Sequence, residues 1–558
     1  MQQVTRPPQR ATKSPAQRLK AGKPLTLAGI SDGAEGLVVA DLARAIAAGD
    51  NPPAVSVAVF CRDGSRMAML SRALGFFAPD IEVLEFPAWD CLPYDRVSPH
   101  AAIVAQRMMT LARLSRVKGR EHPAVLLTTV NAVLQRVPAR GLVARQSLSA
   151  APGNILPMAG ITQWLDLNGF NRAATVREAG DYAVRGGIVD LYAPGMDAPV
   201  RLDFFGDTLE SIRSFDPETQ RTYADLRALD LVPMAEFQLT SDTIRTFRTG
   251  YVAAFGAAGP DDVLYEAVSE GRRYAGMEHW LPLFHPKMET LFDYLEGSPI
   301  AIEPLAEEAA HERLAQIADY FQARKETADM AGGGAPYKPL PPDRLYFAES
   351  EWRERLDRTP LAKLTPFSTP DQVGETIDVG AHAGHNFSAE RNTPGTNVFE
   401  ALTSRVDTLQ AGGKRVMIAL WSEGSRERMA HVVAEHGLHN LTHVASWPQA
   451  LALPAHQIAL VVLGIESGFE TEDVALISEE DILGERLVRT RRQSKRSDNF
   501  IAEVTSLSAG DLVVHVDHGI GRFIGLRAIE AAGAPHDCLE LHYAGGDKLF
   551  LPVENIEL

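Results

Sequence analysis

The alternation of short apolar runs with helical patterns near the start of the chain constrains the fold most strongly. Apolar runs rich in β-branched residues occupy 55–60, 81–86 and 125–130, and amphipathic patterns lie between them at 65–74 and 102–114. Strands that alternate with helices in this way are typical of a mostly parallel sheet with helices on its faces. The pattern predicts a doubly wound α/β domain.

The rest of the chain is expected to contain several further parts, because 558 residues exceed what one core usually holds. Tight turns between short strands indicate a hairpin-rich α+β insertion, and alternating apolar residues near the end indicate a small β-barrel. The expected division is a disordered basic tail (1–24), the first part of the α/β domain (25–136), the insertion (137–223), the second part of the α/β domain (224–329), a linker (330–345), a small α/β domain (346–482), a basic helix or linker (483–505) and the barrel (506–558).

Within the insertion, one expected strand at 200–205 has two distinct faces. Leu202 and Phe204 alternate with Arg201 and Phe205, so an apolar side can enter a core. The opposite side would present charge and an aromatic ring to a partner.

Composition limits the partners. The net charge of −17 makes the chain as a whole a poor nonspecific DNA binder, because a duplex-binding surface needs an excess of lysine and arginine. One basic stretch, at 486–496, is equally consistent with a solvated linker and with a nucleic-acid or polymerase contact. The basic start of the chain resembles a transit peptide in composition but is expected to be a tail.

The cysteines and the apolar runs favour a cytoplasmic protein with no membrane partner. Cys61, Cys91 and Cys538 are far apart and lack the spacing of a zinc site. The longest apolar run, 457–465, is shorter than the roughly 20 residues that cross a bilayer.

A glycine-bearing loop lies where the first strand of the α/β domain would enter its first helix. It carries Gly29, Gly33 and Gly36. A working phosphate-binding loop needs a lysine and a magnesium-binding hydroxyl. The lysine position falls on Glu35 in one register and on Leu37 in the other, so we interpret the loop as a non-functional phosphate loop whose glycines allow close packing.

No group of residues predicts catalysis or a resident metal. The acidic runs at 470–473 and 479–481 are expected to be solvated loops. His515, Asp517 and His518 lack a third or fourth ligand nearby and are expected to be polar residues at a strand end. The sequence therefore predicts neither an enzyme nor a cofactor in this chain.

Several segments resemble a known family. The run FPAWDCLPYD at 86–95, followed by Ser-Pro-His, resembles a signature shared by bacterial transcription-repair coupling factors and the damage-recognition protein UvrB. The resemblance continues through 128–136, 181–192 and 201–207. The last segment resembles the polymerase-interacting module of the coupling factors, which is similar to CarD-type regulators and is absent from UvrB.

The resemblance implies roles for particular residues. It implies a UvrB-like first region without ATP binding and an inserted domain that recruits UvrA. The implied UvrA contacts are Arg172, Arg185, Arg201 and Phe205. The implied contacts with the β subunit of RNA polymerase are Ile524, Leu526 and Arg527, through an exposed strand that could pair at its edge.

The resemblance also implies what the intact protein would do. In the family, an ATP- and magnesium-dependent motor that translocates on double-stranded DNA follows the last module, and this sequence ends at Leu558 before any such motif. The expected function is an adaptor between stalled polymerase and excision repair. Two alternatives remain at this point: an active UvrB-like helicase or damage-binding ATPase, and a CarD-type regulator that acts only through its barrel.

Overall fold

The computed structural model describes residues 14–116, 122–193, 195–259, 262–330, 337–367, 375–484, 510, 512–515, 518–531, 534–543 and 546–552. The chain divides into two compact units, 1–485 and 486–558, and each is described by itself. In the described residues no helix is long and apolar enough to cross a membrane. The basic stretch at 486–496 lies outside the described residues, as does 1–13.

A twelve-stranded sheet runs through the first unit, and its α/β part confirms the expected parallel order. The strands of that part are β1 (Leu25–Ile30), β2 (Val57–Cys61), β3 (Glu82–Phe86), β4 (Ala124–Thr129), β15 (Ile300–Ile302) and β16 (Leu361–Leu364), in the order β1-β16-β15-β2-β4-β3. Neighbours in this order pair in parallel, and α2 (Glu35–Ala47), α3 (Gly64–Phe77) and α4 (Ala101–Arg116) supply side chains to the cores on its faces.

Helices and short strands complete the α/β region. They are α5 (Val130–Val133), β5 (Val137–Pro138), α6 (Arg140–Gln146), α8 (Ser241–Phe255), α9 (Val263–Ser269), η2 (Met277–Leu283), β14 (Met288–Glu289), α10 (Leu291–Leu295), α11 (Ala306–Met330), α12 (Pro342–Leu345) and α13 (Glu349–Asp357). Several boundaries differ from those expected. β16 lies between β1 and β15, so the first α/β domain continues well past 346.

Two segments expected to be irregular are packed. Tyr337, Leu340 and Leu345 are buried in an aromatic-rich core, so the part of the expected linker after 336 belongs to that core. At the other end, Ser14 caps the short helix α1 (Pro15–Arg18), and Leu19 packs against the main core. The described part of the expected basic tail is therefore folded.

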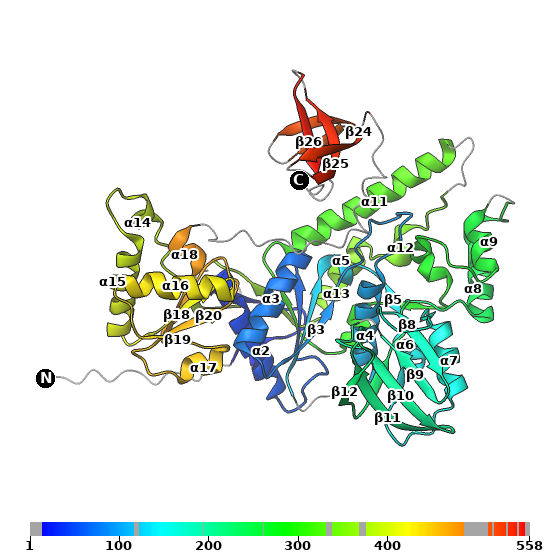
Figure 1. Cartoon of the computed structure of the whole chain (residues 1–558), viewed down its shortest axis with the longest axis horizontal. Coiled ribbons are helices and arrows are strands. Elements are labelled where there is room, and N and C mark those ends of the chain that lie inside the picture. The colour runs from blue at the N-terminus through cyan, green and yellow to red at the C-terminus, as the bar shows by residue number, and fades with distance from the viewer. Residues whose placement is uncertain are drawn as a thin grey trace. The chain divides into compact units, whose positions relative to one another are not determined.

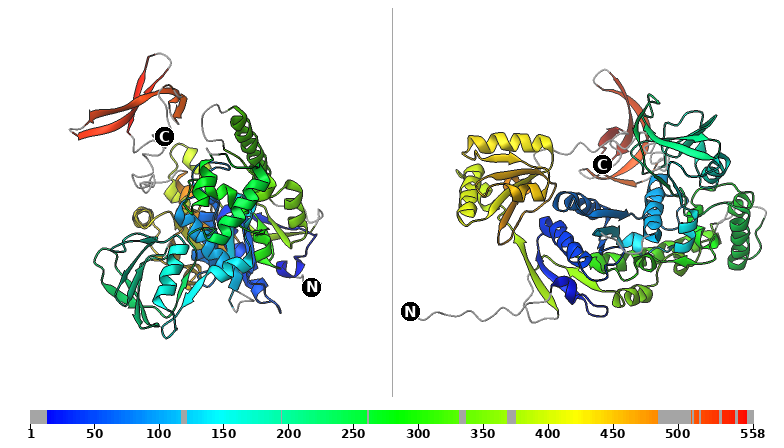
Figure 2. Two further views of the ribbon diagram at one scale, coloured as in Figure 1. Left: turned by 90° about the vertical axis from the view of Figure 1, so that its right-hand side faces the viewer. Right: turned by 90° about the horizontal axis from the view of Figure 1, so that it is seen from below.

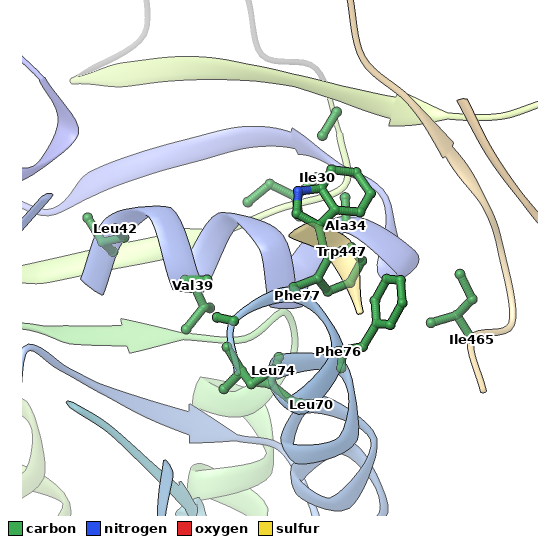
Figure 3. Packing of buried hydrophobic residues seen from close by; sticks show 14 of the residues in the cluster. Ile30, Ala34, Val39, Leu42, Leu70, Leu74, Phe76, Phe77, Trp447 and Ile465 are labelled. Atoms are coloured by element: carbon green, nitrogen blue, oxygen red, sulfur yellow. The ribbon is translucent and has the colours of Figure 1, made fainter. Parts of the chain in front are cut away.

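The small α/β domain adds its strands to the same sheet. Its elements are β17 (Thr376–Ala383), α14 (Ser388–Asn392), α15 (Val398–Ala411), β18 (Arg415–Leu420), α16 (Glu423–Glu435), β19 (Leu441–His443), α17 (Trp447–Ala452), β20 (Ile458–Val462), β21 (Phe469–Glu470), β22 (Val474–Ser478) and α18 (Glu479–Leu483). β17 pairs with β1 on one side and with β21 on the other, which makes one continuous sheet. Trp447 packs on Phe77 with ring centroids 5.1 Å apart, close to Ala34 (Figure 3).

The insertion forms a separate antiparallel sheet with one parallel pair at its edge (Figure 1). Its order is β12-β11-β10-β9-β8-β7, with β7 (Asn171–Arg172), β8 (Asp181–Arg185), β9 (Ile188–Leu191), β10 (Val200–Phe205), β11 (Thr208–Phe215) and β12 (Thr222–Asp225). The helix α7 (Met158–Leu167) packs on one face, and Figure 2 shows this sheet from two further directions. β6 (Leu148–Ala150) pairs with β13 (Leu229–Leu231), so the insertion continues beyond the expected boundary at 223.

The second unit has four antiparallel strands in sequence order. They are β23 (Leu512–His515), β24 (Gly519–Ala531), β25 (Ala534–His542) and β26 (Lys548–Pro552). Phe523, Leu539, Leu541 and Leu551 form its small core. Among the described residues β23 and β26 do not pair, so this part is an open sheet, whereas the sequence predicted a barrel.

Candidate functional site

The loop between β1 and α2 lies where a phosphate-binding loop would, but carboxylates and a neighbouring domain fill its surroundings. Arg66 of α3 binds the Glu35 carboxylate at 2.5 Å and lies 3.6 Å from the buried Glu303 carboxylate. Burial and the nearby Glu303 raise the pKa of Glu35 to about 8. A guanidinium held between two carboxylates therefore lies next to the position where the lysine of a phosphate loop would stand.

The small α/β domain covers the same loop. The Ser31 hydroxyl donates to the carbonyl oxygen of Gly468 at 2.9 Å, and a Cβ on Gly33 would stand 2.2 Å from the carbonyl oxygen of Ser467. A Cβ on Gly36 would be 2.8 Å from Ala73 of α3. Glycines are needed here because backbone and helix approach closely, which agrees with the packing interpretation.

The signature segment at 86–95 lies where two parts of the first unit pack together. The indole nitrogen of Trp89 donates to Glu236 at 3.0 Å, and Arg107 binds the same carboxylate oxygen at 2.6 Å. Arg107 and Glu236 are both almost fully buried, and Tyr94 stacks on the buried His279. The segment therefore connects the α/β domain to the chain that leaves the insertion, and we assign it a structural role.

The sheet of the insertion has a buried face and an outer face, as the alternation at 200–205 predicted. Leu202 is fully buried and Phe204 packs beside it, against residues of α7. Arg201, Asp203 and Phe205 point to the opposite side. We call that side, between β8 and β11, the outer face.

Two of the arginines on the outer face have carboxylate partners within the domain. Arg201 binds Asp190 through two bonds of 2.7 and 2.8 Å, and Asp190 is only 1% exposed. Arg213 binds Asp203 at 2.7 Å. The Arg201 pair uses both carboxylate oxygens and the Arg213 pair uses one, and in both pairs the charge of the arginine is already balanced.

Arg185 differs from both. It lies at the end of β8 and its guanidinium donates only to neutral oxygens, the Ala174 carbonyl at 2.6 Å and the Thr175 hydroxyl at 2.9 Å. No carboxylate of the described residues forms an ion pair with it. Phe205, 76% exposed, lies at the same end of the sheet because β10 ends beside the turn that follows Arg185.

The structure does not bring Arg172 to this face. Arg172 stands in parallel register with Tyr182, whose ring enters the core. Register partners point to the same side of a sheet, so Arg172 leaves edge strand β7 on the side opposite to Arg185.

The four residues implied by the resemblance therefore differ in their surroundings. Arg185 has no carboxylate partner and lies at the same end of the sheet as the exposed Phe205. Arg201 is paired with Asp190, and Arg172 lies on the edge strand β7.

The second unit carries an exposed apolar surface that the sequence reasoning missed. Leu512 and Val514 of β23 stand opposite Arg522 and Ile520 of β24, so all four share one face. Leu512, Val514 and Ile520 are each at least 66% exposed. Alternation with the buried Phe523 was the signal that could have found this surface.

The residues expected to contact polymerase lie on a strand edge. Ile524 is 39% exposed, and Leu526 and Arg527 follow it on β24. Beyond Phe523, β24 pairs with β25 and, among the described residues, has no partner on its other side. The side chains of Leu526 and Arg527 lie outside what the structure describes.

The structure offers no obvious metal site in the part of the chain it describes, where no cluster of three potential ligands occurs. Asp517 and the side chain of His515 fall outside that part.

The acidic run at 479–481 differs from expectation: Glu479 accepts a bond from the Ser425 hydroxyl at 2.6 Å, and Asp481 accepts one from the Ser478 backbone amide in the capping box of α18, both buried. In the run at 470–473, Glu472 and Asp473 are exposed as expected, whereas Glu470 binds Arg405 and Lys414.

Three family models match the chain. A UvrB interaction domain matches 148–237, a MFD D3 domain matches 409–482, and a CarD-like/TRCF RID domain matches 507–558. They correspond to the insertion, the small α/β domain and the second unit.

Relatives match over nearly the whole chain. A transcription-repair-coupling factor of Escherichia coli K12 is 30% identical over 97% of this chain, and one of Myxococcus xanthus is 31% identical over 97%. One of Rickettsia bellii is 30% identical over 90%. The chain belongs to the transcription-repair coupling factor family.

The matched region is part of each relative. The chain spans 45% of the length of the Escherichia coli protein, 46% of the Myxococcus protein and 43% of the Rickettsia protein. Both surfaces described above fall within matched modules of the family: the outer face in the UvrB interaction domain, and the β24 edge in the CarD-like module.

Proposed function

We propose that this chain is the adaptor portion of a transcription-repair coupling factor, which recruits UvrA through the outer face of the insertion and binds the β subunit of RNA polymerase through its last module. The observation that carries the proposal is the outer face itself. It presents an arginine without a carboxylate partner and an exposed phenylalanine at one end of the sheet, in a module that resembles the UvrB interaction domain.

The chemistry of the outer face fits an acidic and apolar partner surface. The Arg185 guanidinium keeps donors free, because only one of its terminal nitrogens is bonded, and a guanidinium fork binds a carboxylate through two parallel bonds. Phe205 adds an apolar side chain whose burial against a partner is energetically favourable. Arg201 would act indirectly, because its pairing with Asp190 fixes strand β10 and hence the position of Phe205.

The polymerase contact is proposed for the edge of β24 and the apolar surface beside it. An unpaired strand edge can add a strand of a partner, and neighbouring apolar side chains then provide specificity. Leu512, Val514 and Ile520 supply such side chains next to Ile524. On this proposal Val514→Asp weakens polymerase binding and leaves UvrA binding unchanged.

The intact protein, on the same proposal, is an ATP- and magnesium-dependent DNA translocase that displaces stalled polymerase in transcription-coupled repair. Nucleotide would act at the motor and not at the β1–α2 loop, where the Glu35 carboxyl binds Arg66 and Ser467 covers Gly33. This arrangement disfavours an active UvrB-like ATPase in the present region.

The proposal is tested by titrating purified UvrA against this chain and its Arg185→Ala variant. Loss of a charge-assisted contact of about 1.5 to 3 kcal/mol weakens binding roughly tenfold to hundredfold. Arg358→Ala is the control, because this exposed arginine is the C-cap residue of α13 and its ion pair is with Glu354 in the last turn of that helix. Equal affinity of the wild type and the Arg185 variant would place the UvrA site elsewhere.

A further inference from the structure

The most exposed large apolar side chain among the described residues is Ile155, in the segment between β6 and α7. It is 82% exposed, more than Phe205 at 76%. Single exposed apolar residues are common on protein surfaces and need no explanation. The position of Ile155 is informative because of what stands beside it.

Strand register places Ile155 in one row with Phe205. Ile155 forms an antiparallel bridge with Thr208, and Thr208 stands opposite Phe205 in the β10–β11 pair. Residues directly opposite each other point to the same side of a sheet. Ile155 and Phe205 therefore flank Thr208 on the outer face, while their neighbours Leu156 and Phe204 pack against the core.

The hydrogen bonds of this segment show that Ile155 stands at the rim of the sheet. Leu209 donates to the Asn154 carbonyl at 3.0 Å and Leu156 donates to the Asp207 carbonyl at 2.7 Å. This pattern makes Ile155 and Thr208 a non-hydrogen-bonded pair, in which the peptide groups of Ile155 point away from β11. The bonds on either side hold the segment against the hairpin, so the side chain has a defined position.

We propose that Ile155 is a further contact residue for the partner that docks on the outer face, and that Ile155 and Phe205 enter one apolar depression of that partner. The inference rests on the proposed function and extends its contact surface by one residue. The surface then consists of the row Ile155, Thr208 and Phe205, with Arg185 level with Asp203 at the same end of the sheet. A matching partner presents an apolar depression wide enough for two side chains, with a carboxylate at the end nearest Arg185.

The occupant is a protein partner with that chemistry, because Phe205 and the unneutralised guanidinium of Arg185 lie at the same end of the sheet. Arg185 forms no ion pair with a carboxylate of the described residues, so a complementary partner surface carries a carboxylate near the apolar contact. Two large apolar groups with a small hydroxyl residue between them form a broad contact, which a flat acidic surface alone would not bury.

Binding of UvrA to the full chain tests the inference with Ile155→Ala, Ile155→Leu and Tyr223→Ala. We expect Ile155→Ala to weaken binding about tenfold and Ile155→Leu to stay within about threefold of the wild type, because leucine keeps the apolar volume. Tyr223, 65% exposed on β12, is the matched control, because it lies at the opposite end of β11 from Thr208. Its truncation is expected to leave affinity unchanged.

The double variant Ile155→Ala with Phe205→Ala tests whether the two side chains share one depression. Residues that contact the same partner group show non-additive effects. We expect the double variant to bind more strongly than the product of the two single losses would give. A strictly multiplicative loss would overturn the shared depression.

The remaining outcomes separate this inference from the proposed function. If Arg185→Ala weakens UvrA binding while Ile155→Ala stays within twofold of the wild type, the inference is wrong and the proposed function stands. If UvrA does not bind the wild-type chain, both fail. If sedimentation shows a dimer that Ile155→Ala dissociates, the face joins two copies of this chain, and the inference is again overturned. Unchanged circular dichroism of each variant confirms that folding is intact.

Discussion

The β1–α2 loop and the outer face of the insertion each have an arginine near a motif that a relative could use for binding. The surroundings of these two arginines, Arg66 and Arg185, are opposite. Arg66 lies between Glu35 and Glu303, under a loop covered by the small α/β domain. Arg185 donates only to neutral oxygens and lies at the same end of the sheet as the exposed Phe205. A charge balanced inside the fold contributes to stability, whereas an unbalanced charge at the surface remains available to a partner.

The largest difference between the two regions is expected in the free energy of unfolding when Arg66 is replaced. Arg66→Ala leaves two carboxylates buried close together, and breaking a buried pair typically costs about 3 to 5 kcal/mol. We expect the lower end, about 3 kcal/mol, because protonation of Glu35 relieves part of the repulsion. Urea unfolding at pH 7 measures this loss of stability, with Arg185→Ala as the matched variant. A loss for Arg185→Ala as large as that for Arg66→Ala would remove the distinction between the two regions.

The raised pKa of Glu35 gives a pH dependence with a definite sign. The pKa of Glu35 is about 8 in the folded chain, against an ordinary value of 4.5 that applies to the unfolded chain. Between pH 4.5 and 8 the folded state therefore holds a proton that the unfolded state has lost. The stability that this proton provides is present below pH 4.5 and is lost as the pH rises toward 8, by up to about 1.4 kcal/mol per pH unit. Glu35→Gln should flatten the dependence between pH 5 and 8. An unchanged slope in this variant would show that Glu35 is ionised in the fold.

Gly33 tests how closely the small α/β domain covers the loop. Gly33→Ala places a Cβ 2.2 Å from the Ser467 carbonyl oxygen, so backbone must move, at a cost of about 2 kcal/mol. Gly75→Ala is the control, since a Cβ there meets nothing within 4 Å and alanine favours the interior of α3 by about 1 kcal/mol. Thermal unfolding of the two variants should therefore shift in opposite directions. Equal shifts would contradict the close cover.

The smallest expected effect is the difference in stability between variants of Arg201 and Arg185 on the outer face. Arg201→Ala leaves the buried Asp190 without its bidentate partner and should cost about 1.5 kcal/mol of stability. Arg185→Ala should change stability by less than about 0.5 kcal/mol, as for most surface substitutions. UvrA affinity should show the reverse order, provided that the Arg201 variant is assayed well below its unfolding temperature. If Arg201→Ala reduced affinity more than Arg185→Ala did, Arg201 would be the contact residue.

Much of the fold could be predicted because local patterns determine it. The strands at 55–60, 81–86 and 125–130, the helices at 65–74 and 102–114 and the alternation at 200–205 all follow apolar periodicity, and the structure confirms them. The boundaries could not be predicted, because they depend on pairing between distant segments. β16 belongs to the first α/β domain since it pairs with β1 and β15, which no local pattern around 361–364 reveals.

The candidate sites divide in the same way. The missing lysine of the phosphate loop is visible in the sequence, but the contact of Glu35 with Arg66 requires the fold to bring α2 and α3 together. The difference between Arg185 and Arg201 is likewise tertiary, because it depends on which arginine finds Asp190 across the sheet. Ile155 gave no signal in the sequence, since its neighbour Thr208 lies more than 50 residues away.

Hydrogen–deuterium exchange of the chain with and without UvrA tests the central claim most directly, because it reports on both regions in one experiment. We expect UvrA to slow exchange in peptides that cover 153–156, 183–188 and 203–209, and to leave the loop at 29–36 unchanged. Slower exchange confined to the loop at 29–36 or to 465–468, with the outer face unaffected, would contradict the claim that the outer face is the docking surface and the loop a structural contact.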